Sequence, residues 1–452
     1  MHSFKQWVEK NRERIQRDYF TFLRFKTIGT DPACKSEMEA CAAWLQHYLQ
    51  TAGFSSRLIQ TSGHPLVWAE HKEAKESAPT LCIYGHYDVQ PVDPLELWLS
   101  DPFEPEVRDG QVYARGALDD KGQIFFAILA VLAFHELQEK LPINMIFCIE
   151  GEEESGSQGL SDVLPDLRDQ LKADYLLVPD FGLLSPDEPA ISLGARGIVT
   201  MEVTLTGSKG DLHSGCYGGI AYNPNRALAE LLSKLWDEEG RVQVPGFYDD
   251  VNGISEEERK LYSYRETKEE YAEKFGIRAL GGEKEVSLME ANWFRPTIEI
   301  NGMSGGYAGP GFKTVIPAQA TAKLSCRLVP SQDPKKIAEQ VGSFLTSRAA
   351  AGMDVNYRVL SAEPAFRGQA ESRLAEAAMG AYTDVMHRPC HRILSGGSIP
   401  IIAQLQEMGL RDVVGMGYGL PGDQIHAPNE HFDMDRLSKG ILTVAGTIQR
   451  LR

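Results

Sequence analysis

Short apolar runs alternate with longer helical patterns over the first 190 residues or so. The runs TLCIYGH, INMIFCIEG and ADYLLVPD have the length of strands, and IFFAILAVLAFHELQ, between the first two, has the length of a helix. Further helices are expected over SEMEACAAWLQHYLQTAG, ended by Gly53, and from about Gly159. This alternation predicts an α/β fold with a mostly parallel sheet and helices on both of its faces.

The pattern changes at Ala195. GIVTMEVTLTG and TAKLSCRLVP alternate apolar and polar residues, as half-exposed antiparallel strands do. Around them we expect helices over NPNRALAELLSKLWDEEG, the charged tract SEEERKLYSYRETKEEYAEKFG and KKIAEQVGSFLTSRAAAG, and a strand over MDVNYRVL. After about Phe366 the strand–helix style returns. We therefore expect one domain over 1–194 and 366–452, and an inserted two-layer α+β domain over 195–365.

Composition limits the classes of protein that this chain can represent. A length of 452 residues fits two domains, and a net charge of −17 argues against nucleic acid or an anionic membrane surface as a partner. The longest apolar stretch, 124–134, is too short to span a membrane. Seven scattered cysteines without a CxxC pair favour free thiols in a reducing compartment. With an amphipathic helix expected over Phe4–Leu23 and no secretory signal pattern, we expect a cytoplasmic protein.

Histidines and carboxylates follow four of the apolar runs. His86 and Asp88 come after TLCIY, four glutamates (150, 152, 153 and 154) after INMIFCI, Asp180 after DYLLVP, and His426 in the loop beyond VVGMGYG; Asp119 and Asp120 stand in RGALDDKG. In open α/β sheets, sites form in the crevice outside the carboxyl ends of the strands. We therefore expect these side chains to converge.

Each of these residues also has an ordinary interpretation on its own. A histidine can be a loop residue, Asp119 a helix N-cap, Asp180 a turn residue and the glutamates a solvated turn. Together, however, so many carboxylates would repel one another unless cations compensate them. Imidazole and carboxylate suit zinc and also manganese. A two-metal site needs a bridging carboxylate, terminal ligands and a free base.

Seven segments carry a resemblance to a known family. GHYDVQP, RGALDDKG, EGEEESGS, DLHSG, KTVIP, RLVP and GGSIP resemble, in order, those of the di-metal aminoacylase/carboxypeptidase-type peptidases, and above all the branch of carnosinases and cytosolic nonspecific dipeptidases. The resemblance extends from about residue 10 to the C-terminus. It implies an enzyme, a metal-dependent dipeptidase that acts on small peptides with a free C-terminal carboxylate.

The resemblance also implies a role for each site residue. Two divalent ions, Zn²⁺ or Mn²⁺, would be held by His86, Asp119, Glu154, Asp180 and His426, with Asp119 as the bridge and joined to Asp120 by a cis peptide bond. Asp88 would orient His86, and Glu153 would be the general base that activates a bridging water. His213 would stabilise the oxyanion, reaching the site from the partner subunit of a homodimer formed through the inserted domain.

Substrate recognition is implied for four further residues. Arg327 matches the arginine that holds the C-terminal carboxylate of the substrate, a task that suits guanidinium geometry. Thr314, Gly397 and Ser398 match smaller contacts around the same carboxylate. Two alternatives stay open: an N-acyl amino acid deacylase or glutamate-type carboxypeptidase with the same chemistry, and, more remotely, a non-enzymatic acidic scaffold that binds no stoichiometric metal.

Overall fold

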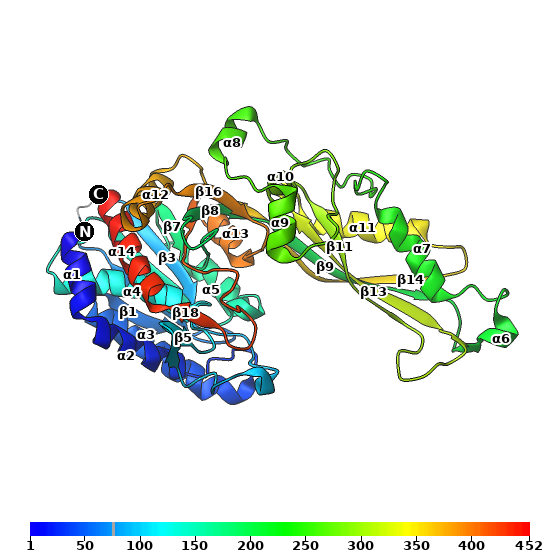
Figure 1. Ribbon diagram of the computed structural model, residues 1–452, viewed down its shortest axis with the longest axis horizontal. Helices are drawn as coiled ribbons and strands as arrows, with labels where there is room; N and C mark the ends of the chain where they lie inside the picture. The colour runs from blue at the N-terminus through cyan, green and yellow to red at the C-terminus, as the bar shows by residue number, and fades with distance from the viewer. Residues whose placement is uncertain (75–76) are drawn as a thin grey trace. The chain divides into compact units, whose positions relative to one another are not determined.

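The computed structural model describes residues 1–74 and 77–452 of the chain. These residues form two compact units, each described by itself below (Figure 1). Unit 1 consists of Met1–Gly194, Arg367–Ile393 and Ile401–Arg452, and unit 2 of Ala195–Phe366 and Leu394–Pro400. Unit 2 differs from the expected insert, 195–365, because it also includes the segment Leu394–Pro400.

Unit 1 is built on a nine-stranded mixed sheet. Its strands follow the order β1-β2-β6-β3-β7-β17-β8-β15, and β16 pairs with β8. The central strands β6, β3, β7 and β17 are parallel, whereas β1 and β2, β2 and β6, and β17 and β8 pair antiparallel. The α/β class is confirmed, and the parallel arrangement holds for the centre of the sheet. The strands are β1 (Ser55–Ile59), β2 (Leu66–His71), β3 (Thr80–His86), β6 (Asn144–Glu150), β7 (Tyr175–Val178), β8 (Ala190–Ala195), β15 (Phe366–Arg367), β16 (His391–Ser395) and β17 (Asp412–Gly415).

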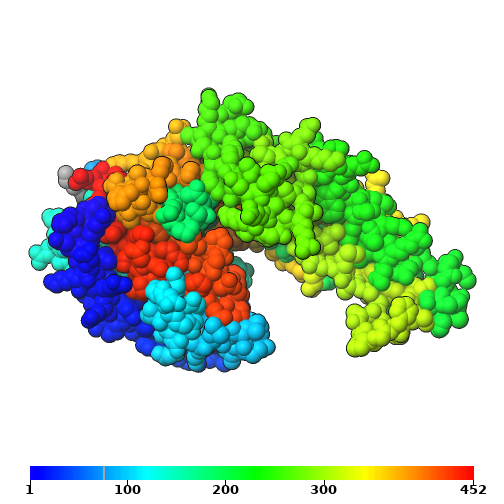
Figure 2. Space-filling model, in the orientation of Figure 1, coloured from blue at the N-terminus to red at the C-terminus, as the bar shows by residue number. Residues whose placement is uncertain are grey.

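The helices of unit 1 pack against this sheet and against one another. Helix α4 is buried from Lys121 through Phe134 and contacts β3 and α14, while α3 contacts β1 and β2, and α12 contacts β17. Figure 2 shows α1 and α2, in blue, on the surface, and α1 contacts α14. The helices are α1 (His2–Lys10), α2 (Arg12–Arg24), α3 (Lys35–Thr51), α4 (Lys121–Glu136), α5 (Gln158–Leu167), α12 (Arg373–Met386), α13 (Pro400–Glu407) and α14 (Met434–Arg450). A separate small sheet joins β18 (His431–Asp433), β5 (Gln111–Tyr113) and β4 (Glu106–Arg108).

The N-terminal helix expected over Phe4–Leu23 is two helices in the structure. The break falls at Asn11, whose side-chain amide donates a hydrogen bond to the carbonyl of Trp7 at 2.8 Å. A short amide side chain that bonds to the nearby backbone competes with regular helix formation. The apolar stripe is retained across the break, because Phe4, Trp7, Ile15 and Tyr19 are all buried.

Unit 2 contains a four-stranded antiparallel sheet in the order β11-β13-β9-β14. Its strands are β9 (Gly197–Thr206), β11 (Thr297–Gly305), β13 (Gln319–Leu328) and β14 (Asp354–Glu363). Helices α7 (Pro224–Leu232) and α11 (Pro334–Arg348) pack on one face, where alternate residues of β9 such as Val199 and Val203 enter a common core. The alternating pattern thus predicted the antiparallel strands correctly.

Two helices expected in unit 2 are shorter than the sequence pattern indicated. The charged tract forms α8 (Glu256–Leu261) and α9 (Lys268–Phe275), because Ser255 and Thr267 each start a new helix with a capping box. Helix α7 ends at Leu232 and continues only as a 3-10 turn to Leu235. The remaining elements are α6 (Ser214–Tyr217), α10 (Leu288–Trp293) and the two-stranded pair β10 (Leu212–His213) and β12 (Val315–Ile316).

Two further sequence expectations concern the cysteines and the membrane. All seven cysteines lie among the described residues and are unpaired, and only Cys216 is exposed. Across 1–74 and 77–452, no helix combines the length and the apolar character that crossing a membrane requires.

Candidate metal centre

Two clusters of potential metal ligands lie in unit 1 and share one residue. His86, Asp119 and Asp180 form the first, and Asp119, Glu154 and His426 the second. Within each cluster the ligand atoms lie within 4.8 Å of one another. His86 ends β3, Asp180 follows β7, and Glu154 follows β6, so the clusters stand at the carboxyl ends of the central parallel strands.

Asp119 presents one carboxylate oxygen to each histidine. Its Oδ1 lies 3.3 Å from Nε2 of His86, and its Oδ2 lies 2.9 Å from Nε2 of His426. Asp180 Oδ2 is 3.9 Å from His86 Nε2, and Glu154 Oε1 is 3.1 Å from His426 Nε2. The carboxylate therefore has the position that a bridging ligand between two cations requires. The two histidines differ in exposure, because the His86 side chain is 1% exposed and that of His426 is 51% exposed.

Asp88 connects the first histidine to the glutamate turn. Its buried carboxylate lies 3.3 Å from Nδ1 of His86, on the side of the ring opposite the cluster. The same carboxylate accepts backbone hydrogen bonds from Glu153 at 3.2 Å and from Glu154 at 3.0 Å. Asp88 thus fixes both the orientation of the imidazole and the turn that carries the two glutamates, as a second-layer carboxylate does at metal sites.

The charges of the clusters favour a bound cation. Burial, with Asp120 and Asp119 nearby, raises the pKa of Asp180 well above its ordinary value. Burial would also raise the pKa of Asp119, but hydrogen bonds from His426 and His86 keep it low. Hydrogen bonds to Asp119 and Glu154 raise the pKa of His426 to about 10. Zinc and manganese bind imidazole in its unprotonated form and carboxylate in its ionised form. The donor set therefore fits divalent cations.

The four glutamates at and beyond the end of β6 have different surroundings. Burial first, with Glu154 and Asp88 adding to it, raises the pKa of Glu153 to about 7, although His86 opposes the shift. Glu150 is 2% exposed and accepts a hydrogen bond from the Tyr84 hydroxyl at 2.6 Å. A carboxyl group with a pKa near neutrality suits a general base. Glu152 instead accepts a hydrogen bond from the backbone N–H of His64, in the loop between β1 and β2.

Sequence reasoning missed a buried carboxylate that holds the Asp119 loop. Glu430 accepts hydrogen bonds from the backbone of Gly116, Leu118 and Asp119 at 3.0, 2.9 and 3.1 Å, and from Arg115 Nη1 at 2.8 Å. It therefore joins the loop of one proposed ligand to the segment that follows His426. The available signal was an acid four residues after that histidine in DQIHAPNE.

In unit 2 the expected substrate residues fall into two groups. Arg327 Nη1 donates to Ser398 Oγ at 2.9 Å, and the backbone of Gly397 lies in the same loop. Thr314 instead adjoins His213, because its carbonyl accepts from Ser214 and His213 pairs with Val315. The two groups stand at opposite ends of β13, which separates Gln319 from Arg327 by roughly 26 Å at about 3.3 Å per residue. Thr314 and Arg327 of one chain therefore do not share a site.

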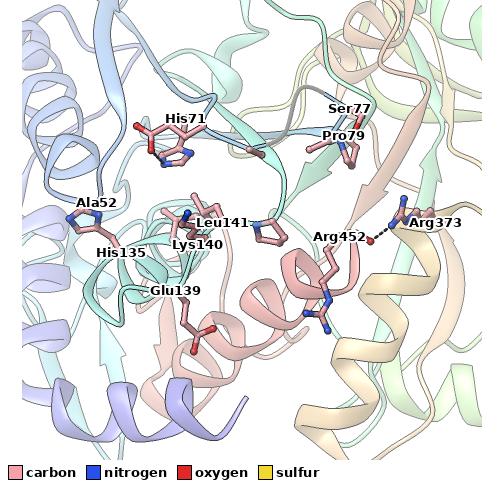
Figure 3. A pocket seen from close by; sticks show the side chains of 15 residues that line it. Ala52, His71, Ser77, Pro79, His135, Glu139, Lys140, Leu141, Arg373 and Arg452 are labelled. Carbon is pink, nitrogen blue, oxygen red and sulfur yellow. Dashed lines mark hydrogen bonds and ion pairs between the residues drawn. The ribbon is translucent and has the colours of Figure 1, made fainter.

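A cavity of about 670 Å³ lies elsewhere in unit 1 (Figure 3). Among its lining residues are His71 at the end of β2, His135 near the end of α4, and Pro79, which directly precedes β3. Since β3 begins beside this cavity and ends in His86, the cavity stands at the opposite end of the strand from the ligand clusters. It is not part of the candidate metal centre.

The site has histidines and carboxylates around one shared aspartate, at the carboxyl ends of parallel strands. Such an arrangement is typical of metal-dependent hydrolases. Comparison with known families identifies the kind of hydrolase. The sequence model of the Peptidase family M20/M25/M40 matches residues 82–450. The chain belongs to this family of metallopeptidases.

Individual relatives agree with this assignment. The chain is 36% identical to the human Beta-Ala-His dipeptidase over 359 residues, which is 78% of this chain and 70% of that protein. It resembles the structure of an M20 family metallo-carboxypeptidase from Sulfolobus solfataricus, with a TM-score of 0.85 and 34% identity over 97% of this chain and 99% of the other. It also resembles the di-peptidase Dug1p from Saccharomyces cerevisiae, with a TM-score of 0.83 and 25% identity over 100% and 98% of the two chains.

Proposed function

We propose that this protein is a metal-dependent dipeptidase that hydrolyses the peptide bond of dipeptides with a free C-terminal carboxylate. The observation that carries the proposal is the pair of ligand clusters sharing Asp119, with the half-buried Glu153 beside them. The names of the relatives support the substrate class, because they include a Beta-Ala-His dipeptidase and a Cys-Gly metallodipeptidase.

The site would hold two divalent ions, Zn²⁺ or Mn²⁺. His86 and Asp180 would bind one, Glu154 and His426 the other, and Asp119 both. Bound cations of this kind lower the pKa of water and polarise the carbonyl group that is to be attacked. Asp88 keeps the His86 ring oriented from its other nitrogen.

Glu153 carries the proton in the proposed reaction. Its carboxylate takes a proton from the attacking water and later gives it to the amine that leaves. The same side chain thus accepts and returns the proton. The backbone hydrogen bond from Glu153 to Asp88 fixes the turn on which this side chain stands. His213 stabilises the oxyanion from the partner subunit of a homodimer formed through unit 2, and Thr314 enters with it.

Arg327 binds the C-terminal carboxylate of the substrate. Ser398 already engages its guanidinium, and the exposed Gly397 leaves room for the backbone of a ligand to approach. A small peptide substrate fits this set of contacts, and the seven free cysteines support a cytoplasmic enzyme. A carboxypeptidase that accepts longer chains is the second candidate, because the Sulfolobus relative is a metallo-carboxypeptidase.

The first prediction tests the metal requirement. Dialysis against excess EDTA should abolish hydrolysis of a dipeptide, and Mn²⁺ or Zn²⁺ should restore it together with about two metal ions per chain by elemental analysis. The same preparation, assayed on dipeptides, tripeptides and N-acyl amino acids, separates the alternatives. Full activity of protein that holds no metal would contradict the proposal, and preference for acylated amino acids or longer peptides would favour the deacylase or the carboxypeptidase.

A further inference from the structure

Two arginines lie on the same face of the sheet in unit 2. In the antiparallel register between β13 and β9, Arg327 pairs with Ile198. Arg196 directly precedes β9, two residues before Ile198, so the strand alternation continued by one residue makes it the diagonal neighbour of Arg327 on the face opposite the α7 and α11 helices. Diagonal neighbours in an antiparallel pair have Cα atoms about 7–8 Å apart, within reach of long side chains.

Both guanidinium groups are partly buried and lack a carboxylate partner. Arg327 donates to the Ser398 hydroxyl and Arg196 Nε donates to the carbonyl of Gly396 at 3.2 Å. Among residues 1–74 and 77–452, neither arginine forms an ion pair. Burial and the charge of Arg327 lower the pKa of Arg196 to about 10, and burial lowers that of Arg327. Two neighbouring cations with little compensation favour an anionic ligand.

The loop that carries Ser398 is attached to Arg196. The Arg196 backbone donates to the carbonyl of Ser395 at 3.3 Å, and the Ser398 hydroxyl donates to the carbonyl of Arg196. The loop also passes close to the guanidinium, because a Cβ at Gly396 would stand 3.1 Å from Arg196 Nη2. The two arginines and this loop therefore make one preformed receptor.

Two other groups act electrostatically on Arg196. Glu299 and Tyr271 both raise its pKa, but burial and Arg327 outweigh them. Glu299 is exposed, and its field offsets only part of the charge. One ligand carboxylate on Arg327 would consequently leave Arg196 as an only partly compensated cation beside it.

We propose that Arg196 binds a second carboxylate next to the one held by Arg327, so that dipeptides with glutamate or aspartate at the C-terminus are the preferred substrates. The inference rests on the proposed dipeptidase function and specifies its substrate class. An acidic C-terminal residue offers two carboxylates a few bonds apart, matching two cationic side chains on one face. Its amide counterpart has the same shape and supplies only one.

The test compares Ala-Glu with the isosteric Ala-Gln. In the metal-loaded wild-type enzyme, kcat/KM for Ala-Glu should exceed that for Ala-Gln by at least about tenfold, mainly through a lower KM. Arg196→Met should bring the ratio close to one by raising KM for Ala-Glu. If the wild-type ratio is already near one, or if the variant loses both substrates equally, Arg196 does not bind a second carboxylate.

Two further variants separate charge from loop support. Glu299→Gln removes the acid that offsets Arg196 and should increase the preference for Ala-Glu. Arg358→Met changes an exposed arginine of β14 in the same sheet and should leave both kcat/KM values unchanged. An equal loss of preference in the Arg358 variant would mean that the general field of the sheet, and not a receptor at Arg196, attracts the acid.

A binding measurement keeps this inference separate from the catalytic proposal. Glutarate and its monoamide, glutaramate, can be titrated calorimetrically into the protein. Glutarate should bind at least about tenfold more tightly, and Arg196→Met should abolish the difference. If no dipeptide is hydrolysed but this difference is found, the dipeptidase proposal fails and the dicarboxylate receptor stands. If dipeptides are hydrolysed but both compounds bind equally, the receptor is overturned alone.

Discussion

At the scale of residues, the glutamates at and beyond the end of β6 demonstrate how surroundings differentiate identical side chains. Glu150 ends β6 and is hydrogen-bonded to Tyr84, whereas Glu153 stands in the turn that follows, where the charges of His86 and Asp119 act on it. Burial is the largest cause of the raised pKa in both, and it leaves Glu150 with a pKa of about 8. Glu150 has no part in the proposed proton transfer, so we expect its protonation to be seen in the stability of the protein.

This placement gives the second prediction, on stability and pH. Below about pH 4.5 Glu150 is neutral in both the folded and the unfolded chain. Between about pH 4.5 and 8 only the unfolded chain loses the proton, so the wild-type free energy of unfolding should fall by about 1.4 kcal/mol per pH unit from this group. Glu150→Gln keeps an oxygen for Tyr84 and removes the titration.

The free energy of unfolding of the variant should therefore exceed that of wild type by an amount that grows from pH 5 to 8 and is constant above that range. Urea unfolding of both proteins at each pH measures this difference. Glu13→Gln, an exposed acid of α2, serves as the matched control and should follow wild type throughout. A difference between Glu150→Gln and wild type that does not change with pH would contradict the assignment.

At the scale of elements, Glu430 is the contact that joins two chain segments far apart in sequence. It bonds the loop before α4 to the segment before β18, and Arg115 also donates to the carbonyl of Pro91 beyond β3. The segment beyond His86 and the loops that bear Asp119 and His426 are thus tied together through one buried ion pair. The relative position of these loops would otherwise depend on segments without regular structure.

The third prediction concerns a variant that lacks this contact. Glu430→Gln leaves Arg115 without a compensating charge and turns an amide NH₂ toward backbone donors, so the free energy of unfolding should fall by about 3–5 kcal/mol. Metal retained after gel filtration should fall as well, because Asp119 loses its backbone anchor. Asp435→Asn, an exposed acid at the start of α14, should change stability by less than about 0.5 kcal/mol. Normal metal retention in a destabilised Glu430→Gln protein would limit the role of Glu430 to stability.

The elements themselves were predictable to the extent that local pattern determines them. Strands such as β3 and β6 appeared in the sequence as apolar runs bounded by polar residues, and the ligands at their ends followed from that. The breaks at Asn11 and Thr267 depend on a single side chain bonding to nearby backbone, which apolar periodicity does not register. Glu430 and Arg196 were missed for another reason. Their roles come from partners that are distant in sequence and meet only in the folded chain.

At the scale of the whole molecule, His213 belongs to unit 2 and lies with Thr314 in the β10–β12 pair, whereas the ligand clusters belong to unit 1. His213 is exposed, and its Nδ1 accepts a hydrogen bond from the backbone of Gly215 at 3.0 Å, which leaves Nε2 available as a donor. Action from the partner subunit, as proposed, requires one intact ligand cluster and one intact His213 on different chains.

The last prediction tests whether the ligand cluster of one chain acts with His213 of the other. Glu153→Gln should keep its metal and lose at least about 10²-fold in kcat, because the base is removed while the ligands remain. His213→Ala should also be inactive, because the oxyanion loses its donor. Mixing the two inactive proteins under conditions of subunit exchange forms heterodimers. In these, one site combines the intact Glu153 of the His213→Ala chain with the intact His213 of the other.

Such mixtures should recover up to about a quarter of the wild-type activity, since half of the dimers are mixed and each has one complete site. Exchange is followed independently with two affinity tags on the chains. The matched control mixes Glu153→Gln with a chain carrying both Glu153→Gln and His213→Ala, a pair in which every site lacks the base, and it should stay inactive. Heterodimers that form and remain inactive would place the action of His213 within its own chain.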